Sequence, residues 1–113
     1  MKTFKTKNNW SGEQYKCCLT MGQYANGGHY IGILYWDKEF GAWMPYADAT
    51  VCLAPLQGNK VALDTNNMPQ IAELFRKHGL GRDTGRHLYS GFCAYPVYEL
   101  NMQKIAEYFV GGN

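Results

Sequence analysis

The chain has 113 residues, of which 46% are hydrophobic and 18% charged, and its formal net charge is +2 at pH 7. A chain of this length can form one domain with a single hydrophobic core. We therefore expect one domain over residues 1–113, in which residues 1–10 could be flexible. A net charge this low excludes recruitment to nucleic acid or a membrane by global charge alone.

The N-terminus and the cysteines bear on the cellular compartment. The first ten residues contain three lysines but no apolar run follows them, so they lack the hydrophobic region of a secretory signal. The longest apolar run, Tyr30 to Trp36, is far shorter than the roughly 20 residues of a membrane helix. We therefore expect a soluble, cytoplasmic protein without membrane contact, whose cysteines are free thiols: Cys17, Cys18, Cys52 and Cys93.

The first half of the chain reads as strands. Tyr15 to Met21 alternates with period two, which predicts Cys17 in the core and Cys18 on the opposite face. The run from Ala25 to Gly28 is a strong turn signal, and Tyr30 to Trp36 is again apolar and aromatic. These two segments should pair as a hairpin.

Further turn signals divide the following residues. Asp37 to Gly41 predicts a second turn, and Ala42 to Leu53 predicts one or two strands interrupted at Pro45. Gly58 and Asn59 then precede Lys60 to Asp64, which we interpret as the last strand of an N-terminal meander. Four or five antiparallel strands are thus expected before any helix.

Two helices are predicted. The cluster from Asp64 to Asn67 can cap the first, Pro69 suits its first turn, and it should end at His78 or Gly79. Its buried face follows helical spacing and consists of Ile71, Leu74, Phe75 and His78. Asn101 can cap the second, which Gly111 and Gly112 stop, with an inward stripe of Met102, Ile105, Ala106 and Phe109.

Between the helices, Tyr89 to Leu100 predicts one strand, and Pro96 favours an edge position or a bend for it. The predicted fold class is α+β: an antiparallel sheet of four to six strands, beginning with the N-terminal meander, with two helices packed on one face.

The phrases LDTNNMPQIAELFRKHGLG and TGRHLYSGFCAYPVYEL carry a family resemblance. With the short helix that follows, they resemble a bacterial family of domains of unknown function, family 4313, from Val61 to Tyr108. The resemblance implies an accessory role on a mobile element and brings no established activity. Residues 1–58 resemble the family only in being rich in strands, so we expect what those strands bind to be particular to this member.

A basic, glycine-punctuated segment spans residues 76–87. It could hold a phosphate or nucleic acid through Arg82, Arg86 and His87, with Tyr89 adjacent. Phosphate-binding loops, however, place their glycines before a helix, and these glycines follow one. A capped connection with solvated arginines explains the same residues.

Catalytic and metal sites are not predicted. Cys93 and His87 would lie about 20 Å apart on one continuous strand, unless the chain folds back at Gly91. Cys17 and Cys18 point to opposite faces of a strand and cannot readily share a metal ion. We therefore predict no catalytic residue, no metal and no cofactor.

The aromatic side chains of the predicted hairpin need a cover. Tyr30 and Trp36 lie on the face opposite Ile31 and Ile33, and either the helices or a partner could cover them. If both helices pack on the other face, this aromatic face is free for recognition. We expect a non-catalytic protein-interaction module, with a homodimer also possible; the alternative is a nucleic-acid or phosphate binder using residues 76–87, and an enzyme is the third option.

Overall fold

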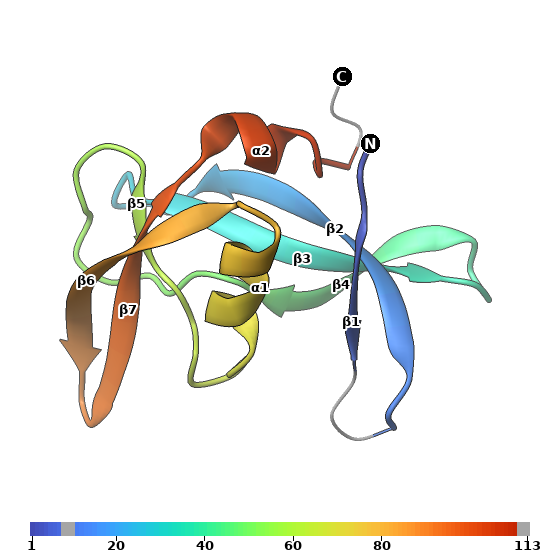
Figure 1. Cartoon of the computed structure of the whole chain (residues 1–113), viewed down its shortest axis with the longest axis horizontal. Coiled ribbons are helices and arrows are strands. Elements are labelled where there is room, and N and C mark those ends of the chain that lie inside the picture. Colours follow the sequence, from blue (N-terminus) through green and yellow to red (C-terminus); the bar gives the residue numbers. More distant parts are fainter. Residues whose placement is uncertain (8–10, 111–113) are drawn as a thin grey trace.

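Over residues 1–7 and 11–110, which the structure describes, this computed structural model forms seven strands and two short helices (Figure 1). A four-stranded meander has the order β1-β2-β3-β4, and a second sheet has the order β5-β7-β6, with antiparallel pairing throughout. The predicted α+β class is confirmed. In chain order the elements are β1 (Phe4–Lys7), β2 (Gln14–Gln23), β3 (His29–Asp37), β4 (Ala42–Asp48), β5 (Lys60–Ala62), α1 (Ile71–Lys77), β6 (Gly81–Ser90), β7 (Cys93–Leu100) and α2 (Met102–Ala106).

The predicted hairpin is present as β2 and β3, joined through a turn in which Gly27 has a φ of 88°. Its partner β4 contains Pro45 at the edge of the sheet, where the register shifts opposite Ile33 and Leu34. Proline is tolerated there because an edge strand has one side with no ladder to complete. On the other edge, Phe4–Lys7 adds β1, a strand that the sequence analysis did not predict.

The strand after Gly58 does not continue the meander. Lys60 and Val61 of β5 pair with Glu99 and Tyr98 of β7, so β5 belongs to the second sheet. Directly after β5, Leu63 forms a bridge with Thr50, which follows β4. The prediction was wrong here because the partner of β5 lies far along the sequence, where no local turn signal indicates it.

Helix α1 begins later than predicted. The Asp64 carboxylate accepts hydrogen bonds from the backbone N–H of Asn67 at 3.1 Å and from its side-chain amide at 2.8 Å, which closes a turn ahead of the helix. The helix then begins at Ile71, after Gln70, which makes no side-chain cap. Its predicted end is confirmed, with His78 as the C-cap and Gly79 at a φ of 68°.

Helix α2 begins as predicted, because the Asn101 side chain accepts a hydrogen bond from the Lys104 N–H at 3.1 Å. Its inward stripe differs at one position: Ala106 is exposed, whereas Tyr108 is buried. Helix α2 ends at Ala106, so the last inward residues lie in the turn after it and do not continue its spacing. The predicted stop at Gly111 and Gly112 lies outside the described residues.

The segment predicted as one strand from Tyr89 to Leu100 is a hairpin of β6 and β7. Strand β7 is the central strand of the second sheet, so the edge position expected from Pro96 is wrong. The Pro96 carbonyl accepts from the Leu63 N–H at 3.0 Å, and in an antiparallel strand the N and C=O of one residue point to the same side. The missing N–H therefore faces the end of β5, and no bond to β6 is lost.

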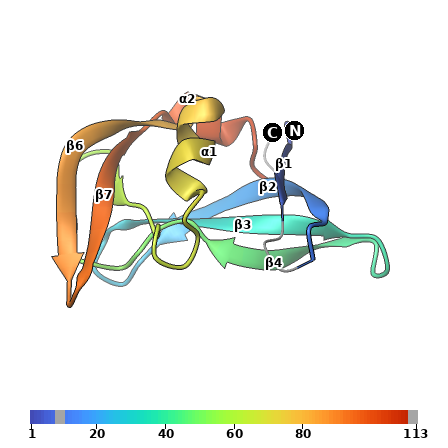
Figure 2. The ribbon, with the colours of Figure 1, turned by 60° about the horizontal axis from the view of Figure 1, so that its bottom comes forward.

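Both helices lie on the same face of the meander (Figure 2), as predicted. Side chains from α1, α2 and both sheets meet there in one core that includes Leu19, Ile31, Phe75, Tyr98 and Ile105, each without appreciable exposure. This arrangement decides which face of the meander is left without a helix.

Candidate interaction surface

The outer face of the meander is the face that points away from the helices. Cross-strand register places its side chains, because residues paired across a sheet point to the same side. Tyr30 and Trp36 both lie on it, and its aromatic side chains are half-buried rather than covered. The outer face consists of Lys16, Cys18, Thr20, Tyr30, Gly32, Leu34, Trp36, Trp43, Pro45 and Asp48.

One end of the outer face carries a tryptophan pair. Trp36 is paired directly with Trp43, their ring centroids lie 5.3 Å apart, and the rings meet edge to face at 72°. The ammonium of Lys16 lies 5.6 Å from the Trp36 centroid and 5.8 Å from that of Trp43. Edge-to-face packing and the cation together hold the two rings in a defined geometry.

Tyr30 lies at the other end, six residues and so roughly 20 Å along β3 from Trp36. Its hydroxyl donates a hydrogen bond to Asp48 Oδ1 at 2.7 Å, and its ring packs edge to face with Tyr24 at 5.5 Å. Burial and the hydrogen bond to Asp48 raise the pKa of Tyr30 to about 12. The ring crosses over Gly32, where a Cβ would lie 3.0 Å from Tyr30 Cζ.

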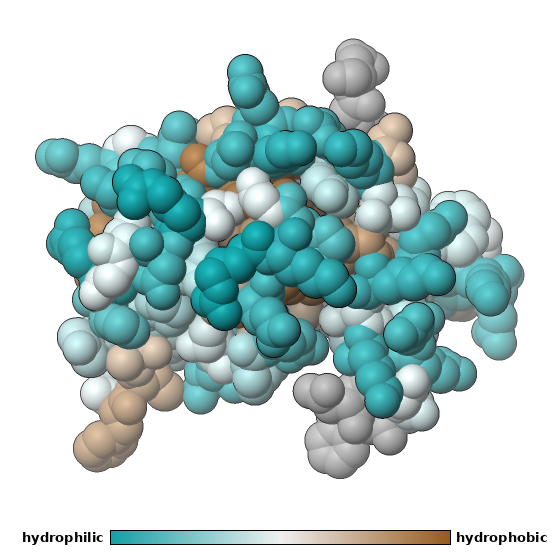
Figure 3. Space-filling model, in the orientation of Figure 1, coloured by the Kyte–Doolittle hydropathy of each residue, from teal (hydrophilic) through white to brown (hydrophobic). Residues whose placement is uncertain are grey.

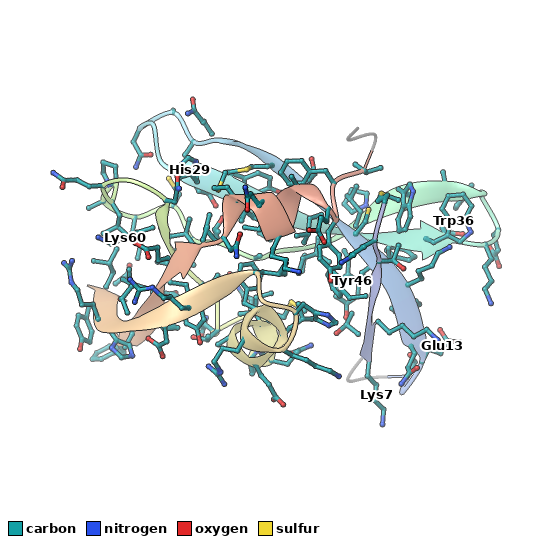
Figure 4. All side chains as sticks on the ribbon, turned by 45° about the horizontal axis from the view of Figure 1, so that its top comes forward. Lys7, Glu13, His29, Trp36, Tyr46 and Lys60 are labelled. Atoms are coloured by element: carbon teal, nitrogen blue, oxygen red, sulfur yellow. The ribbon has the colours of Figure 1, made fainter. Side chains whose placement is uncertain are left out.

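A cleft of about 910 Å³ opens where the β1–β2 arm and the β3–β4 arm diverge. The pairing of β2 with β3 stops at Cys17 and Tyr35, and Figure 4 shows Glu13 and Trp36 on the two separate arms. Hydroxyls of two tyrosines in the cleft already donate to carboxylates, Tyr15 to Glu13 and Tyr35 to Asp37, each at 3.1 Å. The cleft is lined by Glu13, Gln14, Tyr15, Lys16, Tyr35, Trp36, Asp37, Lys38 and Glu39.

Cys18 corrects one prediction, because it is as fully buried as Cys17 although it lies on the opposite face. It pairs with Leu34, and Trp36 lies next along β3 on the same face, so large side chains shield it without any helix. Burial raises the pKa of Cys17 to about 12 and that of Cys18 to about 11. Both thiols are therefore held protonated, which is unfavourable for a nucleophile.

The basic segment is not a loop. Most of it is strand β6, and Gly85, at a φ of 81°, lies in the bulge between Asp83 and His87. The Arg82 guanidinium forms an ion pair with Glu99, with its Nε 3.0 Å from Oε1. These pairings leave less free positive charge than the sequence indicates.

Of the neighbouring basic side chains, one is hydrogen-bonded to the core and two are exposed. Arg76, on α1, donates to the hydroxyl of the buried Tyr98. Arg86, His87 and Tyr89 are exposed in β6, and the rings of the last two lie 6.4 Å apart. The structure therefore brings His87 and Tyr89 together, whereas Arg86 lies in the bulge before them and Arg82 is paired with Glu99.

The chain does fold back at Gly91, whose φ is 59°. Even so, Cys93 pairs with Ser90 while His87 pairs with Pro96, so three steps of the ladder separate the thiol from the imidazole. Within residues 1–7 and 11–110, no group of three or more His, Cys, Asp or Glu side chains is placed to hold a metal ion.

Sequence reasoning missed the tip of the β6–β7 hairpin. Phe92 is fully exposed there and Tyr89 is 74% exposed, and Figure 3 shows an apolar projection at the lower left of a largely hydrophilic side. The signal was the glycine in Ser90-Gly91-Phe92, which could have been interpreted as a tight turn. Phe40, in the β3–β4 turn, is also exposed.

Comparison with known proteins gives a family and no activity. No helix in the described part of the chain is long and apolar enough to cross a membrane. Neither a curated protein nor a solved structure matches the chain. The family described as a domain of unknown function, DUF4313, matches residues 18–112. The match therefore begins in β2, well before Val61. The strands after residue 17 are shared with the family and are not particular to this chain. The chain belongs to the DUF4313 family.

Proposed function

We propose that this chain is a non-catalytic, cytoplasmic protein-interaction module that binds a host protein through the outer face of its meander. The resemblance stated above supports a mobile element of bacteria as its origin, and a host defence factor is the partner that such an origin favours.

The observation that carries the proposal is the position of both helices on one face of the meander (Figure 2). The opposite face presents Tyr30, Trp36 and Trp43 without a helix over them. Tyrosine and tryptophan dominate the energetics of protein interfaces because they bury a large area with few rotatable bonds.

The rings are also fixed before any partner binds. Trp36 and Trp43 pack edge to face, Lys16 lies over both rings, and the Tyr30 hydroxyl is hydrogen-bonded to Asp48. A surface that is ordered in the free protein loses little side-chain entropy on association. The outer face therefore has the properties of a ready-made recognition surface.

The proposal is tested by affinity capture from a lysate of the native host at low and at moderate salt. Tyr30→Ala/Trp36→Ala should abolish capture of a discrete protein that wild type retains at both salt concentrations. Tyr30 and Trp36 are half-buried, so a second variant, Lys16→Glu, leaves both rings in place. Lys16 is exposed and lies over both tryptophans, so reversing its charge changes the outer face with little effect on the core.

Phe92→Ala, in the turn between β6 and β7, is the matched aromatic control and should capture the same protein as wild type. Arg82→Ala/Arg86→Ala tests the alternative. If nucleic acid is recovered instead, and is lost with salt or with the arginine pair, the basic strand β6 is the binding site and the proposal is wrong.

A further inference from the structure

We propose that the groove between β1 and α1 binds an extended acidic peptide as an added strand. The groove has a volume of about 300 Å³ and lies between the free edge of the meander and the helix, which Figures 1 and 4 both show side by side. It is lined by Lys5, Thr6, Lys7, Gln14, Gln70, Glu73, Leu74, Lys77 and His78. The inference does not rest on the proposed function, because neither tryptophan of the pair nor Tyr30 lines the groove; the groove comes nearest to the outer face at Lys5, which is paired with Lys16.

The backbone of β1 has one edge available for a further strand. Among the described residues this strand pairs with β2 alone, from Phe4 opposite Cys17 to Lys7 opposite Gln14. Along an antiparallel strand, every second residue directs its N–H and C=O away from its neighbour. These groups can form the hydrogen bonds of one more strand, and a groove between an edge strand and a helix is a common place for peptides to bind in this way.

The charged side chains along the groove are mainly basic. Three lysines border the groove, Lys5, Lys7 and Lys77, and all three are exposed. Among the described residues that line it, Glu73 alone is acidic. Since burial and the charge of Lys77 lower the pKa of His78, that imidazole adds no charge near neutral pH. The groove is complementary to a negatively charged strand.

The alternation of side chains along β1 determines the order of residues in the ligand. Lys5 and Lys7 are exposed on one face of β1, whereas Phe4 and Thr6 are buried on the other. An added strand alternates in the same way, with acidic side chains beside the lysines and small β-branched ones toward Thr6 and the buried Leu74. An occupant that alternates acidic and small apolar residues therefore matches both faces of β1.

The test measures fluorescence anisotropy of a short labelled peptide of alternating valine and glutamate, titrated with the whole chain. We expect saturable binding that Lys5→Glu/Lys7→Glu weakens by roughly tenfold or more, since two attractive contacts become repulsive. The matched control Lys38→Glu/Lys104→Glu makes the same charge change at exposed positions outside the groove and should bind as wild type does.

Two further ligands separate strand addition from simple charge attraction. The same peptide with alternate backbone amides methylated keeps its charge but loses the N–H groups of one edge, so it should not bind. The proposal is overturned if the methylated peptide binds equally, if a single-stranded oligonucleotide of equal charge competes equally, or if the first peptide does not bind.

Discussion

Single residues decide the form of the outer face. Tyr30 lies flat across β3 because residue 32 of that strand has no side chain, and its hydroxyl reaches Asp48 as a result. The need for glycine there could not be predicted from the sequence, since Gly32 has no positive φ and lies within an apolar run. Its reason is the path of a neighbouring ring, which local pattern does not reveal.

Replacing Gly32 by alanine should displace the Tyr30 ring. The new Cβ would lie 3.0 Å from both Thr20 Cγ2 and Tyr30 Cζ, and the ring can yield only by giving up its bond to Asp48. We expect a loss of about 1 kcal/mol in the free energy of unfolding, the typical value of one hydrogen bond, measured by urea denaturation. Gly27→Ala is not a suitable control because of its positive φ, whereas Tyr30→Phe is, and it should cost a similar amount. Full stability in Gly32→Ala would show that the ring is not held there.

At the scale of elements, the sequence predicts local pairing well and distant pairing poorly. The β2–β3 hairpin and the end of α1 follow from turn and cap signals next to them in the chain. The position of β5 beside β7 depends instead on residues roughly forty positions apart, such as Lys60 and Glu99. The Asp64 carboxylate illustrates the same limit, because it closes a turn before α1 rather than capping the helix.

The junction of α1 with β1 predicts a dependence of stability on pH. His78 packs against Phe4 at a ring distance of 5.6 Å and against Tyr108 at 6.1 Å, and burial, with the nearby Lys77 charge, lowers its pKa below 6.5. The unfolded chain therefore takes up the proton more readily than the folded chain does. Stability contributed by neutral His78 is present above pH 6.5 and is lost as the pH falls toward the lower folded pKa.

His78→Phe keeps a ring in this position and removes its titration. We expect its melting temperature to fall less than that of wild type when the pH is lowered from 7.5 to 5.5, as followed by circular dichroism. Lys5, Lys7 and Glu73 line the same groove and are unchanged in the variant, so they contribute equally to both curves. Equal falls in the two proteins would contradict the linkage.

At the scale of the whole molecule, the arrangement of layers determines which of the predicted site residues lie together. The sequence separates Tyr30 and Trp36 from Ile31 and Ile33 by alternation, but only the packed helices show which face is uncovered. The ion pair of Arg82 could not be predicted for a related reason: its partner Glu99 lies on β7, which comes beside β6 only when the hairpin closes.

The most direct test of recognition by the outer face is photo-crosslinking in the native host. Benzoylphenylalanine is placed either at Pro45, an exposed position of the outer face that does not hold the aromatic rings, or at Gln103, an exposed position of α2 on the helix side. We predict one discrete protein adduct from position 45 and none from position 103. An adduct from position 103 alone, or no adduct from position 45, would contradict the proposed role of the outer face.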